Sequence, residues 1–151
     1  MAASAWQIYR EFKESLALAK VNLSSDSIKC ALLLSTSNCG DVGLATAHYA
    51  TLTNQVAGLF GYATGGVVVA ATWTKVDGTC TFDVADPTWV ASGGDIVARF
   101  AVLYDNTSTD KDLIAYCLLD ATPANIVCED GNPLTLQIGA SGVFTLSGGE
   151  V

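Results

Sequence analysis

The chain has 151 residues, of which 50% are hydrophobic and 15% are charged, and its formal net charge is -8. This length supports one domain whose hydrophobic core needs neither disulfides nor a metal ion to fold. The acidic balance argues against nucleic-acid binding, which requires clustered Lys and Arg, and no apolar run approaches the roughly 20 residues of a membrane-spanning helix.

The N-terminal segment, residues 1–22, is predicted to contain the only substantial helix, over residues 4–20. Its apolar side chains recur every fourth residue, at Ile8, Phe12 and Leu16. Such spacing is typical of one helix face, and Ser4 is a candidate N-cap. Charged residues interrupt the segment, so it lacks the apolar core of a secretory signal. We expect this helix to pack on the rest of the fold or on a neighbouring subunit, with Trp6 as an anchor.

Residues 28–34 are apolar on both faces, which predicts a central, deeply buried strand. Residues 35–66 follow as a long irregular excursion, rich in glycine and small polar residues, with at most a short helical turn near residues 48–52. Such excursions in compact domains are usually functional or buried against a partner. The chain's single histidine, His48, is interpreted as structural or interfacial, because no nucleophile or carboxylate is recognisable beside it.

From residue 67 onwards the sequence predicts short antiparallel strands that alternate apolar and polar side chains. The predicted strands are residues 67–75, 79–84, 89–90, 96–104, 113–119, 134–138 and 142–146. Asp77 and Gly78 favour a tight hairpin turn, because glycine tolerates the positive φ that the turn requires. The predicted fold class is mainly β: one antiparallel, jelly-roll-like β-sandwich domain over residues 1–151, with a single N-terminal helix.

The chain contains five cysteines: Cys30, Cys39, Cys80, Cys117 and Cys128. They are interpreted as buried free thiols rather than disulfides, with Cys39, in a polar loop, as the expected exception.

Arg99 interrupts an apolar strand and is expected to pair with Asp83 or Asp86, or to emerge at an edge or interface.

No catalytic constellation is recognisable, so the sequence predicts no enzyme and no cofactor. Asp105, Asp110 and Asp112 flank a Ser/Thr loop and could in principle ligate calcium. Their spacing is not that of a calcium-binding loop, and we interpret them as a solvated loop. The dispersed cysteines do not form a zinc site either, and the sequence therefore predicts no metal.

Several segments together resemble small structural proteins of tailed-bacteriophage virions. These segments are ALLLSTSN, YATLTNQVAG with GYATGG, GTCTFDVADPTWVASGGDIVARFAVLYDN, LIAYCLLD and LTLQIGASGVFTLS. Proteins of this kind decorate or cement the capsid, or form part of a fibre or neck. The resemblance implies a non-enzymatic decoration protein, made in the host cytoplasm and located in the virion, that self-associates as a trimer and binds the major capsid protein. The alternative is a fibre, neck or tail component that recognises a host-surface glycan or protein.

Contact surfaces are expected on the N-terminal helix and on the 35–66 excursion, because these parts are least needed to close a sandwich. The candidate interface residues are Trp6, Tyr9, Phe12, Tyr49, Leu59, Phe60, Tyr62 and Arg99. The apolar side chains in this set would supply buried area at such a contact, and Arg99 is the charge expected at an edge or interface.

Overall fold

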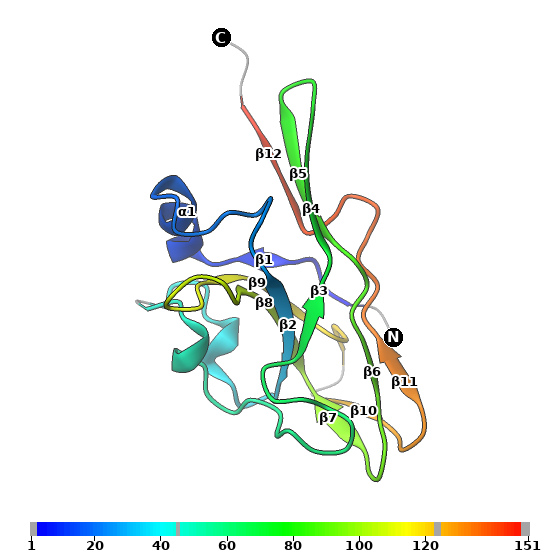
Figure 1. Cartoon of the computed structure of the whole chain (residues 1–151). Helices are drawn as coiled ribbons and strands as arrows, with labels where there is room; N and C mark the ends of the chain where they lie inside the picture. Colours follow the sequence, from blue (N-terminus) through cyan, green and yellow to red (C-terminus); the bar gives the residue numbers. More distant parts are fainter. Residues whose placement is uncertain (1–2, 45, 123–124, 149–151) are drawn as a thin grey trace.

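The computed structural model describes residues 3–44, 46–122 and 125–148, and it is mainly β with antiparallel sheets and one short helix, α1 (Figure 1). The helix is α1 (Arg10–Ala17), and two 3-10 turns are η1 (Asn38–Gly40) and η2 (Tyr49–Thr51). The strands are β1 (Gln7–Ile8), β2 (Ile28–Leu33), β3 (Val67–Val69), β4 (Ala71–Val76), β5 (Thr79–Val84), β6 (Thr88–Val90), β7 (Ile96–Ala98), β8 (Phe100–Asp105), β9 (Leu113–Leu118), β10 (Ile126–Cys128), β11 (Pro133–Thr135) and β12 (Phe144–Ser147). Within the described ranges, no helix is long and apolar enough to span a membrane.

The largest sheet has five strands in the order β1-β9-β8-β2-β3. Strand β2 pairs along its whole length with β8, and five of its six residues are buried. Strands β8 and β9 are also largely buried. The prediction of a deep strand over residues 28–34 is therefore confirmed, and this sheet forms the centre of the core.

The N-terminus differs from its prediction, because the helix begins at Arg10 and the residues before it run along β9. Gln7 is paired with Tyr116 in strand register. The backbone N–H of Ser4 donates to the Leu118 carbonyl at 3.0 Å, and the Ser4 hydroxyl accepts the Leu118 N–H at 2.9 Å. Ser4 thus fixes an edge strand instead of capping a helix. The apolar spacing was compatible with both structures, and the open edge of β9 decides between them.

The 35–66 excursion covers the part of β2 that β3 does not reach. Strand β3 pairs with β2 only as far as Cys30. Beyond it, the Leu32 carbonyl accepts the Val56 N–H at 3.1 Å and the Leu32 N–H donates to the Tyr62 hydroxyl at 2.9 Å. The predicted helical turn near residues 48–52 is confirmed as η2. The excursion therefore satisfies backbone groups that would otherwise be buried without partners.

Two of the predicted long strands are each divided between two sheets. The 67–75 strand breaks at Ala70, after which β4 leaves the large sheet to pair with β5. The 96–104 strand breaks at Arg99, so that β7 pairs with β10 and β8 pairs with β2 and β9. The hairpin turn between β4 and β5 is confirmed, with φ of 47° at Asp77 and 79° at Gly78.

The remaining strands form the sheet β12-β5-β4 and the pairs β11-β6 and β10-β7. Aromatic rings join the three-stranded sheet to the helix: Phe144 lies 5.8 Å from Phe12, 5.4 Å from Phe82 and 6.3 Å from Trp73, measured between ring centroids. These rings fill the space between the sheet and the rest of the core.

Candidate interaction surfaces

The sheet β12-β5-β4 extends out of the body of the protein as an arm, with the β4–β5 turn at its end (Figure 1). We define the arm tip as residues 74–81 and 145–147. None of these residues is buried. The tip is therefore a piece of sheet without a core of its own, and an exposed sheet of this size is marginally stable unless something packs on it.

One face of the arm continues the core face of the sheet beyond the body. The strand register places Trp73, Lys75, Phe82, Cys80, Phe144 and Leu146 on this face. Phe82 and Phe144 are buried at the base of the arm, whereas Leu146, further out, is 44% exposed. The opposite face carries mainly threonine side chains together with Val76, which is 68% exposed. The apolar face of the arm therefore runs from buried side chains at its base to solvent-exposed side chains at its tip.

A second exposed apolar surface, the Leu59–Phe60 patch, lies in the excursion. Leu59 is 58% exposed and Phe60 is 44% exposed. Phe60 has a φ of 56°, which is unusual for a bulky residue. It is held there by the Ser92 N–H, which donates to the Phe60 carbonyl at 3.0 Å, and its ring lies against Gly94, where a Cβ atom would come within 2.5 Å of it. The patch is therefore fixed in position.

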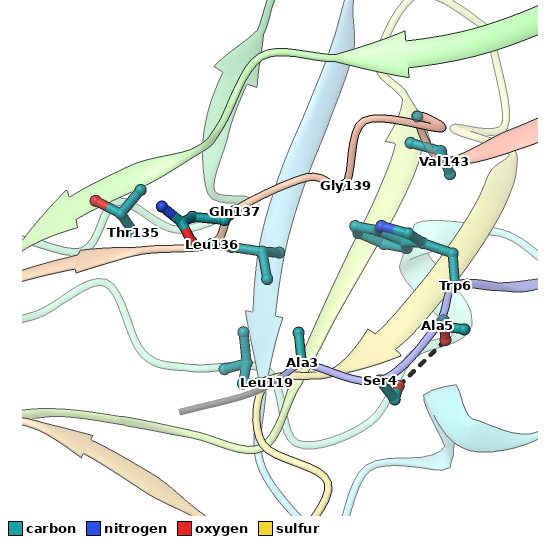
Figure 2. Close-up of a pocket in the computed structure, with 11 residues that line it drawn as sticks. Ala3, Ser4, Ala5, Trp6, Leu119, Thr135, Leu136, Gln137, Gly139 and Val143 are labelled. Atoms are coloured by element: carbon teal, nitrogen blue, oxygen red, sulfur yellow. Dashed lines mark hydrogen bonds between the residues drawn. The ribbon is translucent and has the colours of Figure 1, made fainter.

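A groove of about 560 Å³ separates residues 3–6 from residues 135–143. Figure 2 shows the indole of Trp6 extending into the space between these two segments, with Val143 on one side of it and Leu136 and Leu119 further along the groove. Among the described residues, no charged side chain lines the groove, although the chain as a whole is strongly acidic. Its chemistry suits an uncharged ligand or an uncharged peptide segment.

Comparison of the chain with protein-family models, with curated proteins and with solved structures gave no match. Functional inference for this protein therefore depends on its own residues and contacts.

The remaining candidate interface residues lie at different depths. Tyr9, Phe12 and Tyr62 are buried, so within this fold they belong to the core and cannot reach a partner. Tyr49 is half-buried and stacks on Tyr104 with a centroid distance of 4.2 Å. The sequence pattern identified these side chains as apolar stripes, but it could not distinguish a stripe facing the core from one facing another subunit.

Arg99 does not make the ion pair that its sequence context suggested. Its Nη1 donates to the Asp120 carbonyl oxygen at 2.7 Å. The carboxylates of Asp83 and Asp86 instead accept the N–H groups of Val84, at 2.9 Å, and Ile138, at 2.8 Å. The prediction of a partner at Asp83 or Asp86 is wrong, because the Arg99 guanidinium is directed to the Asp120 carbonyl instead. Arg99 itself is half-buried at the break between β7 and β8.

The Ser/Thr loop after β8 is not simply solvated, because Asp105 and Asp112 are buried and only Asp110 is exposed. One Asp105 oxygen accepts the N–H groups of Thr107 and Ser108, at 2.7 and 3.2 Å, while the other has no partner among the described residues. Burial raises the pKa of Asp105 to about 6; the Thr107 N–H opposes this rise, and the neighbouring Asp26 carboxyl adds to it. Among the described residues, no group of side chains has the arrangement of a metal site.

Asp105→Asn is expected to stabilise the protein above about pH 6 and to flatten its melting temperature as a function of pH. The pKa of Asp105 in the folded protein lies above its ordinary value of about 4, so its contribution to stability is present below that pH and is lost as the pH rises toward 6. Asparagine keeps an accepting oxygen and, like the protonated acid, carries no charge. Asp110→Asn, in the same loop but exposed, is the matched control. Parallel melting profiles for wild type and Asp105→Asn would contradict this assignment.

His48 has a carboxylate neighbour that sequence reasoning missed. Its Nε2 lies 4.0 Å from an Asp112 carboxylate oxygen, and the same oxygen accepts the Ser15 hydroxyl at 2.8 Å. The three residues are far apart in the chain, so no local signal could have revealed this cluster. Ser15 donates to Asp112 and not to His48, so the cluster lacks the contact by which a histidine activates a serine.

The prediction that the cysteines are buried is confirmed for Cys30, Cys117 and Cys128. Cys39, the expected exception, is also buried, and burial raises the pKa of its thiol to about 11. Cys80, on the arm, is the half-buried one. A buried thiol with a raised pKa is a poor nucleophile, so Cys39 is structural.

Proposed function

We propose that this protein is a non-enzymatic structural component of a phage virion, which decorates the capsid, associates with copies of itself and binds the major capsid protein. The proposal includes a jelly-roll-like β-sandwich as the architecture of this domain. The observation that carries it is the arm, a sheet that leaves the body with an apolar face and open edges. Such a feature is costly in an isolated chain and gains stability when a partner covers it.

Two separate surfaces support association with two different partners. The arm lies at one end of the molecule, and the turn between β6 and β7, against which the Leu59–Phe60 patch is held, lies at the other (Figure 1). We assign the arm to contacts between copies and the Leu59–Phe60 patch to the capsid. Burial of such side chains contributes about 25 cal/mol per Å² of apolar area, which adds up when many copies bind one shell.

The alternative function is a fibre, neck or tail component that recognises a host-surface glycan or protein. The uncharged groove beside Trp6 favours it, because a tryptophan with neighbouring hydroxyl and amide groups suits neutral polar ligands. The alternative predicts that the purified protein binds host cells in the absence of capsids, whereas the decoration proposal predicts binding to capsids.

Leu59→Ser and Phe60→Asn are expected to weaken capsid binding at least about tenfold, since exposed apolar anchors dominate most interfaces. Asparagine is chosen at position 60 because it tolerates positive φ, so the backbone stays unstrained. The measurement is co-sedimentation of purified protein with capsids that lack it. Val68→Ser is the matched control, because Val68 is 63% exposed on β3, where its register partner is Lys29 of β2.

The outcomes of this experiment separate the alternatives. Wild-type protein that does not sediment with capsids would overturn the decoration proposal. Normal binding by both patch variants would overturn the assignment of the Leu59–Phe60 patch to the capsid. Weak binding by Val68→Ser as well would show that the losses reflect general damage to the surface.

A further inference from the structure

Strand β12 forms one edge of the arm. It pairs with β5 on one side, from Phe144 to Ser147, and it is the outermost strand of its sheet. On its other side, no strand of the described residues satisfies its backbone N–H and C=O groups. An edge of this kind is chemically complementary to one class of partner, another extended strand that supplies main-chain hydrogen bonds.

The other sheet edges in the described structure carry features that discourage strand pairing, and β12 does not. Strand β11 begins with Pro133, and β4 carries Lys75 at an exposed position. Strands β1, β3, β6, β7 and β10 are only two or three residues long. Proline, lysine and short length are common ways of protecting an edge. The sequence of β12, FTLS, contains neither a charge nor a proline, so its edge is left open.

The distribution of charge favours contact between two copies at their arms rather than at their bodies. The chain carries a net charge of -8, so the bodies of two copies repel each other at low salt. Within the arm tip, however, Lys75 and Asp77 are the only charged residues and they cancel. The arm projects from the body (Figure 1), so pairing through it leaves the two acidic bodies outside the contact.

From these observations we propose that two copies of this protein pair edge to edge through β12, antiparallel and about a two-fold axis, so that their arms form one continuous six-stranded sheet. In this arrangement the Leu146 side chains of the two copies lie near each other on the same face of the sheet. They extend the apolar face that begins with Phe82 and Phe144 in each copy. The inference deepens the self-association in the proposed function and rests on it.

A two-fold arrangement fits the arm better than the three-fold arrangement expected from the virion resemblance. Strands β4 and β12 are both antiparallel to β5, so they are parallel to each other. A ring of three arms about an axis along the strands would require β12 of each copy to pair in parallel with β4 of the next, beside Lys75. Antiparallel pairs are more common than parallel ones, and two-fold dimers are the most common oligomers.

The test is the mass of the full-length protein over a concentration series, by light scattering and sedimentation equilibrium. Wild type is expected to form dimers, and Leu146→Lys is expected to raise the dissociation constant at least about tenfold, equivalent to about 1.4 kcal/mol. Val127→Lys is the matched control, because it introduces the same charge at an exposed strand valine outside the arm. Both substitutions reduce the net negative charge, so a loss of dimers in Leu146→Lys alone cannot come from general repulsion.

Each result decides the inference. A wild-type protein that stays monomeric, or a dimer that Leu146→Lys leaves intact, would overturn it. A trimer that depends on Leu146 would overturn the two-fold arrangement. Failure here is distinguishable from failure of the proposed function: normal capsid binding without dimers overturns only the pairing, whereas Leu146-dependent dimers that never bind capsids overturn only the decoration role.

Discussion

Gly66→Ala is expected to leave the protein largely unfolded. Gly66 has a φ of 78°, and an added Cβ would lie 1.8 Å from the Cys30 carbonyl oxygen and 2.7 Å from the Ala31 Cα. Both atoms belong to the backbone of β2, which lies between β8 and β3 in the largest sheet, so neither can move without disrupting that pairing. Most domains are stable by only about 5–15 kcal/mol. The loss is measured as the soluble fraction and the thermal unfolding curve by circular dichroism.

Gly78→Ala is the matched control, because Gly78 has nearly the same φ, 79°, but no heavy atom within 4 Å of the added Cβ. It retains only the conformational cost of positive φ, on the order of 1–2 kcal/mol. We expect it to fold with a melting temperature lowered by a few degrees. Equal losses of stability in the two variants would show that the close approach of Gly66 to β2 does not determine the effect of the substitution.

Phe82→Ala is expected to lower the free energy of unfolding by about 3–5 kcal/mol, the usual cost of removing a fully buried phenylalanine ring. Phe82 is completely buried and contacts Phe144 at the base of the arm. Its loss leaves a cavity where the arm joins the body, so hydrogen exchange of the β4, β5 and β12 amides should accelerate more than that of β2 and β8 amides. Chemical denaturation gives the free energy.

Val76→Ala is the control on the same sheet, since Val76 is exposed at the arm tip. It is expected to change the free energy of unfolding by less than about 0.5 kcal/mol, as most surface substitutions do. If Phe82→Ala were equally mild, the arm would not be anchored to the core through its aromatic base.

The parts of the fold that the sequence predicted are those decided by local chemistry. Asp77 and Gly78 specify their turn by conformational preference alone, and residues 28–34 are apolar on both faces wherever they lie. Strand β1 was missed because the free edge of β9, more than a hundred residues away, determines its conformation. The breaks at Ala70 and Arg99 were missed because alternation of side chains continues through a strand that changes sheets.

For the candidate surfaces, the sequence identified which side chains are apolar but not what covers them. Leu59 and Phe60 are exposed as an interface would require, whereas Tyr9 and Phe12 are buried in the core. The arm was not foreseen, because the pattern of β4 and β5 resembles that of any hairpin. The arm projects because the rest of the described chain packs against the base of the arm and leaves its tip unburied.

The most direct measurement of the proposed role is the location of this protein on particles of the phage that the proposal implies, by antibody labelling or by density in electron micrographs. The decoration role predicts label distributed over the outer surface of the head. Label confined to a fibre, neck or tail, or particles without label, would contradict it.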